Sequence, residues 1–285
     1  MISIILVTYN RIDLLKKILK KIQSYNWSYS EFIIINNNSF DETKDFLNTL
    51  NKGFKVINLT ENIGHGAALS VGLKYIVNKL ENKDGFTVFL EDDSIPSEKL
   101  LETLINKIKD TNFDFISSEG QKVKLGKRIN LKPKEEEIVE ADFCLFDGAI
   151  IKNHVMYKIG LHEEDWFMMF DDFEYCYRIR KNGFKIGVIY NNFHEVLHLG
   201  GGNINRTSSP WRGYYQTRNH VFFLKKHFSI LNLLDFCIIN FKRFIGCFFI
   251  DNKFQRIKYR TIGIYHGLLG LKGKTLLPDT LKFTE

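Results

Sequence analysis

Two kinds of hydrophobic pattern alternate along the first hundred residues. Four nearly continuous apolar runs, each ending in polar residues, occupy positions 2–10, 31–39, 54–62 and 85–93. The segments between them carry apolar residues at helical spacing, as in 11–26, where the leucines and isoleucines fall on one face. Strands that are apolar throughout are typical of parallel sheets covered on both faces. The sequence therefore predicts an α/β fold with a mostly parallel sheet flanked by helices.

The middle of the chain continues this pattern with an interruption. Residues 120–140 are charged and aperiodic, which favours an exposed hairpin or mobile loop. Strand, glycine turn and short helix return over 142–161. An aromatic loop then precedes a helix from about Asp171 to Asn182, and Gly183 ends it before another strand.

Composition narrows the class of protein. With 285 residues, 44% hydrophobic, the chain can form one large domain or a domain with an appendage. Its four cysteines lie far apart and form no CxxC pair, which favours reduced thiols in a cytosolic protein over disulfides or zinc. The apolar N-terminus is too short for a signal sequence and lacks a basic start, so we expect a first strand and a chain that is not exported.

Positive charge is concentrated near the C-terminus. The net charge is +7, with an estimated pI of 9.0. Between residues 225 and 274, ten Lys and Arg stand against two acids, a net +8, so the rest of the chain is close to neutral. This segment predicts an anionic partner, such as a phospholipid, a nucleic acid or a phosphorylated small molecule.

Three consecutive acids, Glu91, Asp92 and Asp93, follow the apolar run that ends at Leu90. Carboxylates at a rigid strand end suit a hard divalent cation. The alternative is a solvated acidic turn that caps the next helix. Polar clusters also end the first two strands, at 8–10 and 36–38. In an open parallel sheet, ligands bind beyond the carboxyl ends of the strands, so we expect all three clusters to line one crevice.

Seven motifs occur in the order found in one enzyme family. They are VTYNR, IIINNNSFDET, ENIGHGAALSVGL, LEDDS, MMFDDFEYCYRIRKNGFKI, LHLGGG and YYQTRN, and together they span residues 2 to about 225. The chain thus resembles family 2 glycosyltransferases of the GT-A type, in the branch with bacterial rhamnosyl- and galactofuranosyltransferases. The resemblance implies a Rossmann-like fold with a C-terminal helical extension. It also implies an inverting, metal-dependent hexosyltransferase.

The resemblance places the cation, Mn²⁺ or Mg²⁺, on Asp93, Glu91 and His198. Glu91 stands where the family usually has Asp, so direct ligation and action through water both stay open. Three roles also stay open for Asp92: capping the turn, contacting the nucleotide sugar, or ligating the cation directly. A divalent cation would offset the negative charge that develops on the departing diphosphate.

Asp172 matches the family's catalytic base, and Asp171 matches the acid that precedes it. The implied reaction is one in-line displacement in which Asp172 takes the acceptor proton. From the residues alone, both acids are also explained as stabilising a helix N-terminus. Trp166 and Phe167 precede them, and either acceptor binding by stacking on a sugar ring or burial in the core explains these aromatics.

The nucleotide-sugar site is expected at the N-terminal strand ends. Thr8, Tyr9 and Arg11 match positions that contact base or phosphate in the family. Asn36 stands in place of the Asp that usually reads a pyrimidine, and we expect UDP or dTDP as the carrier. The remaining predicted contacts are Asn38, Asn62 and Gly64; a plain helix start also explains Asn62 and Gly64.

The resemblance divides the chain at about residue 225. Residues 1–225 form the expected catalytic domain, with a nucleotide-sugar half over about 1–95 and an acceptor half over about 96–225. Residues 226–285 form a basic, amphipathic helical arm. In 229–250, Lys242 and Arg243 argue against a membrane-spanning helix, and an apolar arc fits a helix lying in an anionic membrane surface. The alternative is packing on the catalytic domain or in a homodimer.

These expectations imply a lipid-linked glycan acceptor for a cell-surface polysaccharide, and an enzyme on the inner face of a bacterial membrane.

Two other classes of protein are alternatives to a glycosyltransferase. A non-catalytic nucleotide or nucleic-acid binding module would use the basic arm, but aromatics do not interleave with its charges, so no nucleic acid is expected. A nucleotidyltransferase would need a glycine-rich, basic loop after the first strand, and VTYNRIDLL has no glycine.

Overall fold

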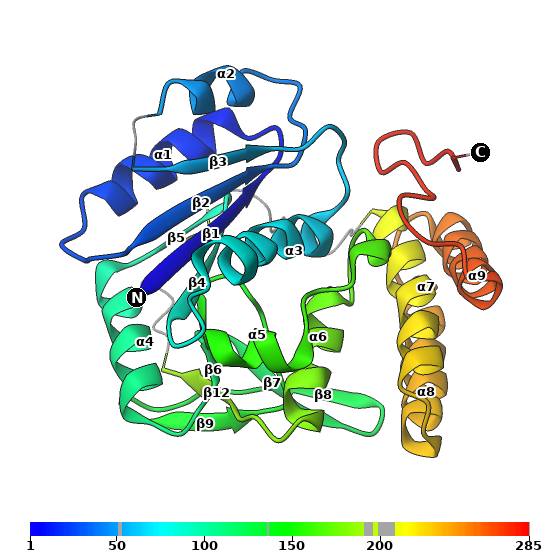
Figure 1. The fold of residues 1–285 in the computed structure, drawn as a ribbon. Helices are drawn as coiled ribbons and strands as arrows, with labels where there is room; N and C mark the ends of the chain where they lie inside the picture. Colours follow the sequence, from blue (N-terminus) through cyan, green and yellow to red (C-terminus); the bar gives the residue numbers. More distant parts are fainter. Residues whose placement is uncertain (51–52, 136, 191–195, 199–208, 285) are drawn as a thin grey trace.

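The computed structural model describes residues 1–50, 53–135, 137–190, 196–198 and 209–284. Its largest sheet has eight strands in the order β3-β2-β1-β4-β11-β6-β12-β9 (Figure 1). The strands are β1 Ile2–Thr8, β2 Glu31–Asn36, β3 Lys55–Asn58, β4 Phe86–Glu91, β6 Phe115–Ser117, β9 Ile138–Ala141, β11 Ala149–Lys152 and β12 Ile186–Ile189.

The pairing of these strands confirms a mostly parallel sheet. Strands β3, β2, β1 and β4 run parallel, and β12 runs parallel to β6. Strand β11 is antiparallel to both β4 and β6, and β9 is antiparallel to β12. The carboxyl ends of β1, β2 and β4 therefore meet at one edge, with Thr8 opposite Asn36 and Val7 opposite Glu91.

Helices cover both faces of the sheet. One face packs against α1 Ile12–Gln23, α2 Thr43–Asn48 and α4 Glu98–Asp110. The other packs against α3 His65–Tyr75, which continues as a π-helical turn over Ile76–Leu80, and against α5 Asn153–Ile159 and α6 Asp171–Lys181. Successive residues of β1, such as Ile4 and Ile5, enter opposite cores and are fully buried, which explains the continuous apolar runs.

Short strands lie beside the sheet. Residues 120–130 form a hairpin of β7 Gly120–Lys124 and β8 Lys127–Asn130, which β10 Phe143–Cys144 extends. The predicted hairpin is thus present, and it packs against the C-terminal helices, because the Gly126 N–H donates to Asp235 Oδ1 at 2.8 Å. A second small pair joins β5 Ser94–Pro96 to β13 Val196–His198.

Three helices stand together at one side of the molecule: α7 Pro210–Lys226, α8 Ile230–Cys247 and α9 Lys253–Leu269 (Figure 1). Glycines allow α9 to approach α7 closely. A Cβ at Gly263 would lie 2.4 Å from the Tyr214 carbonyl oxygen, and one at Gly267 would lie 2.9 Å from that of Arg218. The chain then folds back, and Tyr215 Oη donates to the Leu276 carbonyl at 2.8 Å. The helical bundle thus begins at α7, before the predicted boundary near residue 225.

Helix α8 has a polar side and an apolar side, and the polar side faces the protein. Asn240 is buried there, and Asp235 forms an ion pair with Arg128 of the hairpin. Large apolar side chains lie on the exposed side and just beyond the helix end: Ile230, Leu231, Leu233, Leu234, Phe241, Ile245, Phe248 and Phe249. No helix among the described residues has both the length and the hydrophobicity needed to span a bilayer. The arm therefore packs on the α/β part of the chain and still presents an apolar surface.

Candidate active site

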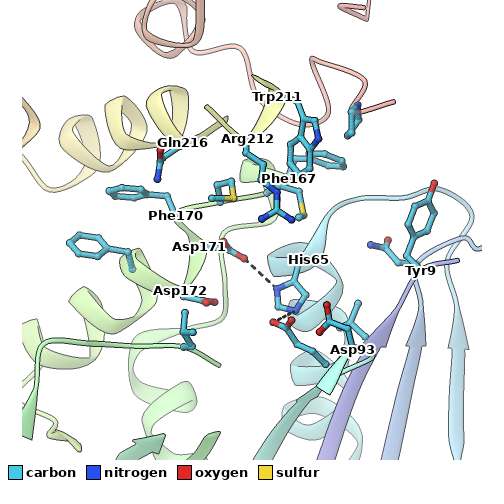
Figure 2. A pocket seen from close by; sticks show the side chains of 18 of the residues that line it. Tyr9, His65, Asp93, Phe167, Phe170, Asp171, Asp172, Trp211, Arg212 and Gln216 are labelled. Carbon is cyan, nitrogen blue, oxygen red and sulfur yellow. Dashed lines mark ion pairs between the residues drawn. The ribbon is translucent and has the colours of Figure 1, made fainter. Parts of the chain in front are cut away.

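The three polar strand ends line one cavity of about 760 Å³. Its wall on the side of β1, β2 and β4 contains Thr8, Tyr9, Arg11, Asn37, Asn62, His65, Glu91, Asp92 and Asp93. The segment at the start of α6 forms the facing wall, with Phe167 and Phe170 above Asp171 and Asp172 (Figure 2). The acids predicted for metal binding and those predicted for catalysis thus belong to a single cavity.

Arg11 connects two of the strand-end acids. Its Nη1 atom lies 2.7 Å from Asp92 Oδ1 and 2.7 Å from Asp93 Oδ2. The other Asp92 oxygen accepts the backbone N–H of Tyr9 at 3.1 Å. Both oxygens of Asp92 are therefore engaged within the protein, and this carboxylate fixes the turn that follows β1.

Among the three strand-end acids, Glu91 has the largest upward shift of its pKa. Burial raises its pKa, as do the negative charges of Asp147 and Asp93, and His65 only partly opposes them, so that the pKa is about 7. Its backbone N–H donates to Asp147 Oδ1 at 3.1 Å, which holds the end of β4 in place. A carboxylate with such a high pKa gains from a nearby cation.

His65, at the start of α3, bridges the two groups of acids. Its Nε2 lies 3.6 Å from Glu91 Oε1, and its Nδ1 lies 3.6 Å from Asp171 Oδ2 (Figure 2). Burial opposes a charge on the ring, but the hydrogen bond to Asp171 and the charge of Glu91 outweigh it and raise the pKa of His65 to about 10. Sequence analysis assigned His65 no role.

The two acids at the start of α6 have opposite pKa shifts. Burial acts to raise the pKa of Asp171, but the contact with His65 outweighs it and lowers the pKa. Burial raises the pKa of Asp172 well above its usual range, and the charge of Asp171 adds to this. Asp172 Oδ1 is buried and has no hydrogen-bond partner within the described part of the chain. Two carboxyl groups with divergent pKa values are typical of catalytic sites.

A possible cation position also arises from this geometry. Ligand atoms of His65, Asp171 and Asp172 lie within 4.8 Å of one another. A cation there would occupy the carboxylate predicted to act as base. A cation on the strand-end acids Glu91 and Asp93 would leave Asp172 free.

The loop before α6 has an unusual backbone. The φ angles are 60° at Phe167, 69° at Met169 and 73° at Phe170. Residues other than glycine rarely adopt this left-handed region. Asn219 of α7 holds this loop, because its Nδ2 lies 2.8 Å from the carbonyl oxygens of Trp166, Met168 and Met169. Arg218 Nη2 also donates to the Trp166 carbonyl, at 2.9 Å. The YYQTRN motif thus shapes the cavity wall through the backbone.

Glycines at the start of α3 allow this loop to approach. Gly64 has a φ of +90°, and a Cβ there would lie 1.7 Å from the Phe167 carbonyl oxygen. A Cβ at Gly66 would lie 2.9 Å from Asp171 Oδ2. Close packing of α3 against the start of α6 therefore explains both glycines.

We expect Gly64→Ala to destabilise the fold by about 3 kcal/mol and to reduce turnover, because the new methyl group meets backbone that cannot rotate away. Urea denaturation and activity assays measure the two effects. Gly246→Ala is the matched control, since nothing lies within 4 Å of a Cβ at that helical glycine. Equal stability of the two variants would contradict the packing role of Gly64.

The cavity contains most, but not all, of the predicted site residues. Thr8, Tyr9, Arg11, Asn62, Glu91, Asp92, Asp93, Phe167, Asp171 and Asp172 line it. Trp166 is only 4% exposed and packs against Phe222, so it belongs to the core. Asn36 is buried and bonds Asn58 and Ser39, which makes it a support for the strand ends.

Three other predicted residues lie beside the cavity or outside the description. Asn38 is exposed and Gly64 contacts the Phe167 loop, and neither lines the cavity. The backbone of His198 pairs with Ser94, next to Asp93, and its side chain lies outside the described structure. Sequence analysis also missed Asn37, Gln121, Arg128, Arg212 and Arg243, which line the cavity. Only Asn37 had a signal in the sequence, as part of a polar strand end.

Comparison with known proteins agrees with this arrangement. The family model described as glycosyl transferase family 2 matches residues 3–182. The hexosyltransferase Agl10 of low-salt glycan biosynthesis in Haloferax volcanii is 23% identical, covering 98% of this chain and 94% of its own. The dTDP-rhamnosyl transferase RfbF of Shigella flexneri is 23% identical, covering 95% of each chain.

Solved structures share the fold. TarS of S. aureus, in complex with UDP-GlcNAc, has a TM-score of 0.63 at 15% identity and covers 95% of this chain and 81% of its own. The mannosyltransferase PcManGT of Pyrobaculum calidifontis, with GDP-Man and Mn²⁺, has a TM-score of 0.56 at 14% identity, covering 94% and 75%. The α/β sheet with its helical extension is therefore the GT-A fold, and the chain belongs to glycosyl transferase family 2.

Proposed function

We propose that this glycosyltransferase moves a sugar from a UDP- or dTDP-sugar, of the rhamnose or galactofuranose type, to a glycan acceptor with inversion. One observation carries the proposal: Asp172 and the acids at the end of β4 face the same cavity from opposite walls. The dTDP-rhamnosyl transferase among its relatives supports such a donor. The UDP-GlcNAc complex of TarS supports a nucleotide sugar in this fold.

The nucleotide end of the cavity contains Thr8, Tyr9, Arg11 and Asn62. Arg11 can approach a diphosphate from this wall, because Asp92 holds its guanidinium at the strand ends. Asn62 Oδ1 accepts the N–H of Gly64 and the amide of Asn37, which fixes the entry to α3. These residues orient the donor; they transfer no proton.

Glu91 and Asp93 would hold a divalent cation, Mn²⁺ or Mg²⁺. Their carboxylate oxygens are the ligands that hard cations prefer, and the raised pKa of Glu91 indicates negative charge that the protein leaves uncompensated. GalNAc-T7 and PcManGT, which share the fold, contain Mn²⁺ in their structures. His198 is a third candidate ligand, from a strand paired with β5 beside Asp93. A bound cation would offset charge on the departing diphosphate.

Asp172 serves as the base in this proposal. It sits rigidly at the start of α6, and its unpartnered Oδ1 is free to accept the proton of an acceptor hydroxyl. Asp171 is committed to His65, which keeps it ionised and holds the α6 terminus against α3. Phe167 and Phe170 line the space above both acids and provide apolar faces for a sugar ring (Figure 2).

A donor panel tests this function. The purified chain is incubated with Mn²⁺ and a set of UDP- and dTDP-sugars, and release of the nucleoside diphosphate is recorded for each. We expect one donor or a few related ones to be consumed. Nucleoside triphosphates serve as the comparison, since release of pyrophosphate from them would instead indicate a nucleotidyltransferase. Tight binding without any turnover would favour a non-catalytic module.

The apolar side of α8 supports a lipid-linked acceptor and attachment to an anionic membrane on the cytoplasmic face. Phe241 is 66% exposed and Phe249 is 83% exposed, and the surrounding segment carries a net charge of +8. A relative in Campylobacter jejuni, 32% identical over 57% of this chain and 55% of its own, is named for an undecaprenol-diphosphate-linked acceptor. Apolar side chains among basic residues fit such a surface.

We expect the protein to float with anionic vesicles at low salt and to dissociate partly at high salt, because salt screens only the electrostatic part of binding. The double variant Leu234→Gln, Phe241→Gln should bind about tenfold more weakly. Phe40→Gln, which changes an 82% exposed ring elsewhere, is the control. Absence of flotation, with a dimer seen by size-exclusion chromatography, would assign the apolar side to a second subunit.

A further inference from the structure

Arg243 enters the cavity from the polar side of α8, and no acid among the described residues forms an ion pair with it. Its side chain lines the cavity, and its Nη1 atom is buried. Within the described residues, no hydrogen-bond acceptor reaches this atom. A buried guanidinium nitrogen without a hydrogen-bond partner is costly, so proteins seldom keep one unless a ligand pairs with it.

The nearest acid is already used by another arginine. Asp235 accepts two hydrogen bonds from Arg128, at 3.1 Å and 2.6 Å, and a third from the Gly126 N–H at 2.8 Å. Its charge is therefore matched by Arg128 alone. Arg243 and the neighbouring Arg260 remain as net positive charge beside this pair.

The pKa of Arg243 reflects this surplus. Burial lowers it, and the positive charges of Arg260 and Arg128 lower it further, to about 9, against a smaller opposing effect of Asp235. An anion close to Arg243 would stabilise the charged form of its guanidinium group. The local field therefore favours a ligand of negative charge.

This positive group lies at the acceptor side of the cavity. Arg128 stacks on Phe173, with 5.0 Å between its Cζ and the ring centroid, and Phe173 follows the proposed base Asp172. The donor wall, with Arg11 and the strand-end acids, consists of different elements, β1 and β4. An anion at Arg243 is thus separate from the nucleotide diphosphate.

We propose that Arg243, supported by Arg128, binds a phosphoryl group of the acceptor. The inference rests on the proposed function and deepens it by naming a class of acceptor. Guanidinium groups hold phosphate oxygens through paired, charge-assisted hydrogen bonds. Since α8 also carries the exposed apolar side, the diphosphate of a polyprenyl-linked acceptor fits this position. A phosphate within the glycan itself shares the same chemistry.

Equilibrium binding to the full chain tests the site without any turnover. The probes are farnesyl diphosphate, inorganic pyrophosphate, glycerol 3-phosphate and farnesol, each measured by titration calorimetry. We expect Arg243→Gln to weaken farnesyl diphosphate binding about tenfold or more and to leave farnesol unchanged. Lys258→Gln, which removes one exposed charge from α9, should bind as the wild type does. Arg243→Lys keeps the charge and should bind with intermediate affinity.

The outcomes separate this inference from the function it rests on. Loss of phosphoryl binding in Arg243→Gln with unchanged UDP affinity supports the site, even if no tested donor is consumed. Preference for farnesyl diphosphate assigns the anion to the lipid carrier, and equal affinity for glycerol 3-phosphate assigns it to the glycan. Equal binding by wild type and Arg243→Gln overturns the site. A matching loss of UDP affinity also overturns it, because Arg243 would then belong to the donor.

Discussion

Replacing Asp172 with Asn is expected to reduce sugar transfer by about three orders of magnitude and to leave donor binding intact. Asn has the same shape but cannot take a proton, so the acceptor hydroxyl stays protonated at the moment of attack. The nucleotide wall, which lies across the cavity on β1 and β4, is unchanged. Single-turnover rates and calorimetry with the nucleoside diphosphate measure the two effects separately.

The acid limb of the pH profile gives a second measurement of the same change. Burial and Asp171 raise the pKa of Asp172, so a base at this position loses its proton only at higher pH than an ordinary carboxyl group. The wild-type rate should therefore rise with pH as Asp172 ionises, and this rise should be absent in Asp172→Asn.

Two variants serve as controls for Asp172. Asp165→Asn changes an exposed acid nearby and should retain activity. Asp171→Asn removes the partner of His65 and should weaken the α6 terminus with a smaller effect on rate. A larger defect in Asp171→Asn would make Asp171 the base. Equal loss of donor affinity in Asp172→Asn would move Asp172 to the donor site.

Asp93→Asn is expected to reduce turnover by about two to three orders of magnitude and to leave the fold intact. The carboxylate supplies both charge and an oxygen ligand at the strand end, and an amide supplies neither equally well. Chelation of the wild-type protein should have the same effect, and added Mn²⁺ should restore the wild type alone. Thermal unfolding confirms that the variant remains folded.

Asp84→Asn is the matched control, because Asp84 is an exposed acid in the turn before the same strand. It should respond to chelation and to Mn²⁺ as the wild type does. Near-normal activity of Asp93→Asn after chelation would show that the reaction needs no cation on this acid. The role of Arg11, which also pairs with Asp93, would then need to be tested in the same way.

The sheet was predictable because a strand buried on both faces has a continuous run of apolar residues. Residues such as Ile4 and Ile5 enter opposite cores, so β1 is apolar without a break from Ile4 to Val7, and that pattern identifies a parallel strand. The reversed direction of β11 is not visible in this pattern, since Ala149–Lys152 is equally buried. Direction is set by the connection through Phe146 and Gly148, where the chain turns sharply.

The candidate site was predictable where its residues lie at strand ends or helix starts. Asp93 and Asp172 occupy such places, and both line the cavity. His65 was missed because it lies within a glycine run whose glycines were explained by an anion-binding helix start. Its contacts with Glu91 and Asp171 join segments that are far apart in the chain.

Long-range pairing also explains the remaining misses. Arg128 stands in a charged hairpin and Arg243 in the arm, and each looks like an ordinary surface charge in its own segment. Tertiary contacts between the hairpin and α8, among them the ion pair of Arg128 with Asp235, bring them to one cavity. For Trp166 the error is the opposite one. An aromatic residue beside the catalytic acids suggests a platform for a sugar ring, but Trp166 packs against Phe222.

Helix α8 has consequences for how this chain tolerates mutation. Among its inward positions, Arg243 lines the cavity and Asp235 pairs with Arg128, which also lines it. Outward positions such as Phe241 belong to the surface that we assign to lipid. A saturation screen with a soluble acceptor would therefore find only the inward half sensitive. The same screen with an acceptor embedded in vesicles would make both halves sensitive. The location of the acceptor thus determines which substitutions in this helix selection tolerates. Homologues that modify soluble glycans would be free to lose the outward phenylalanines.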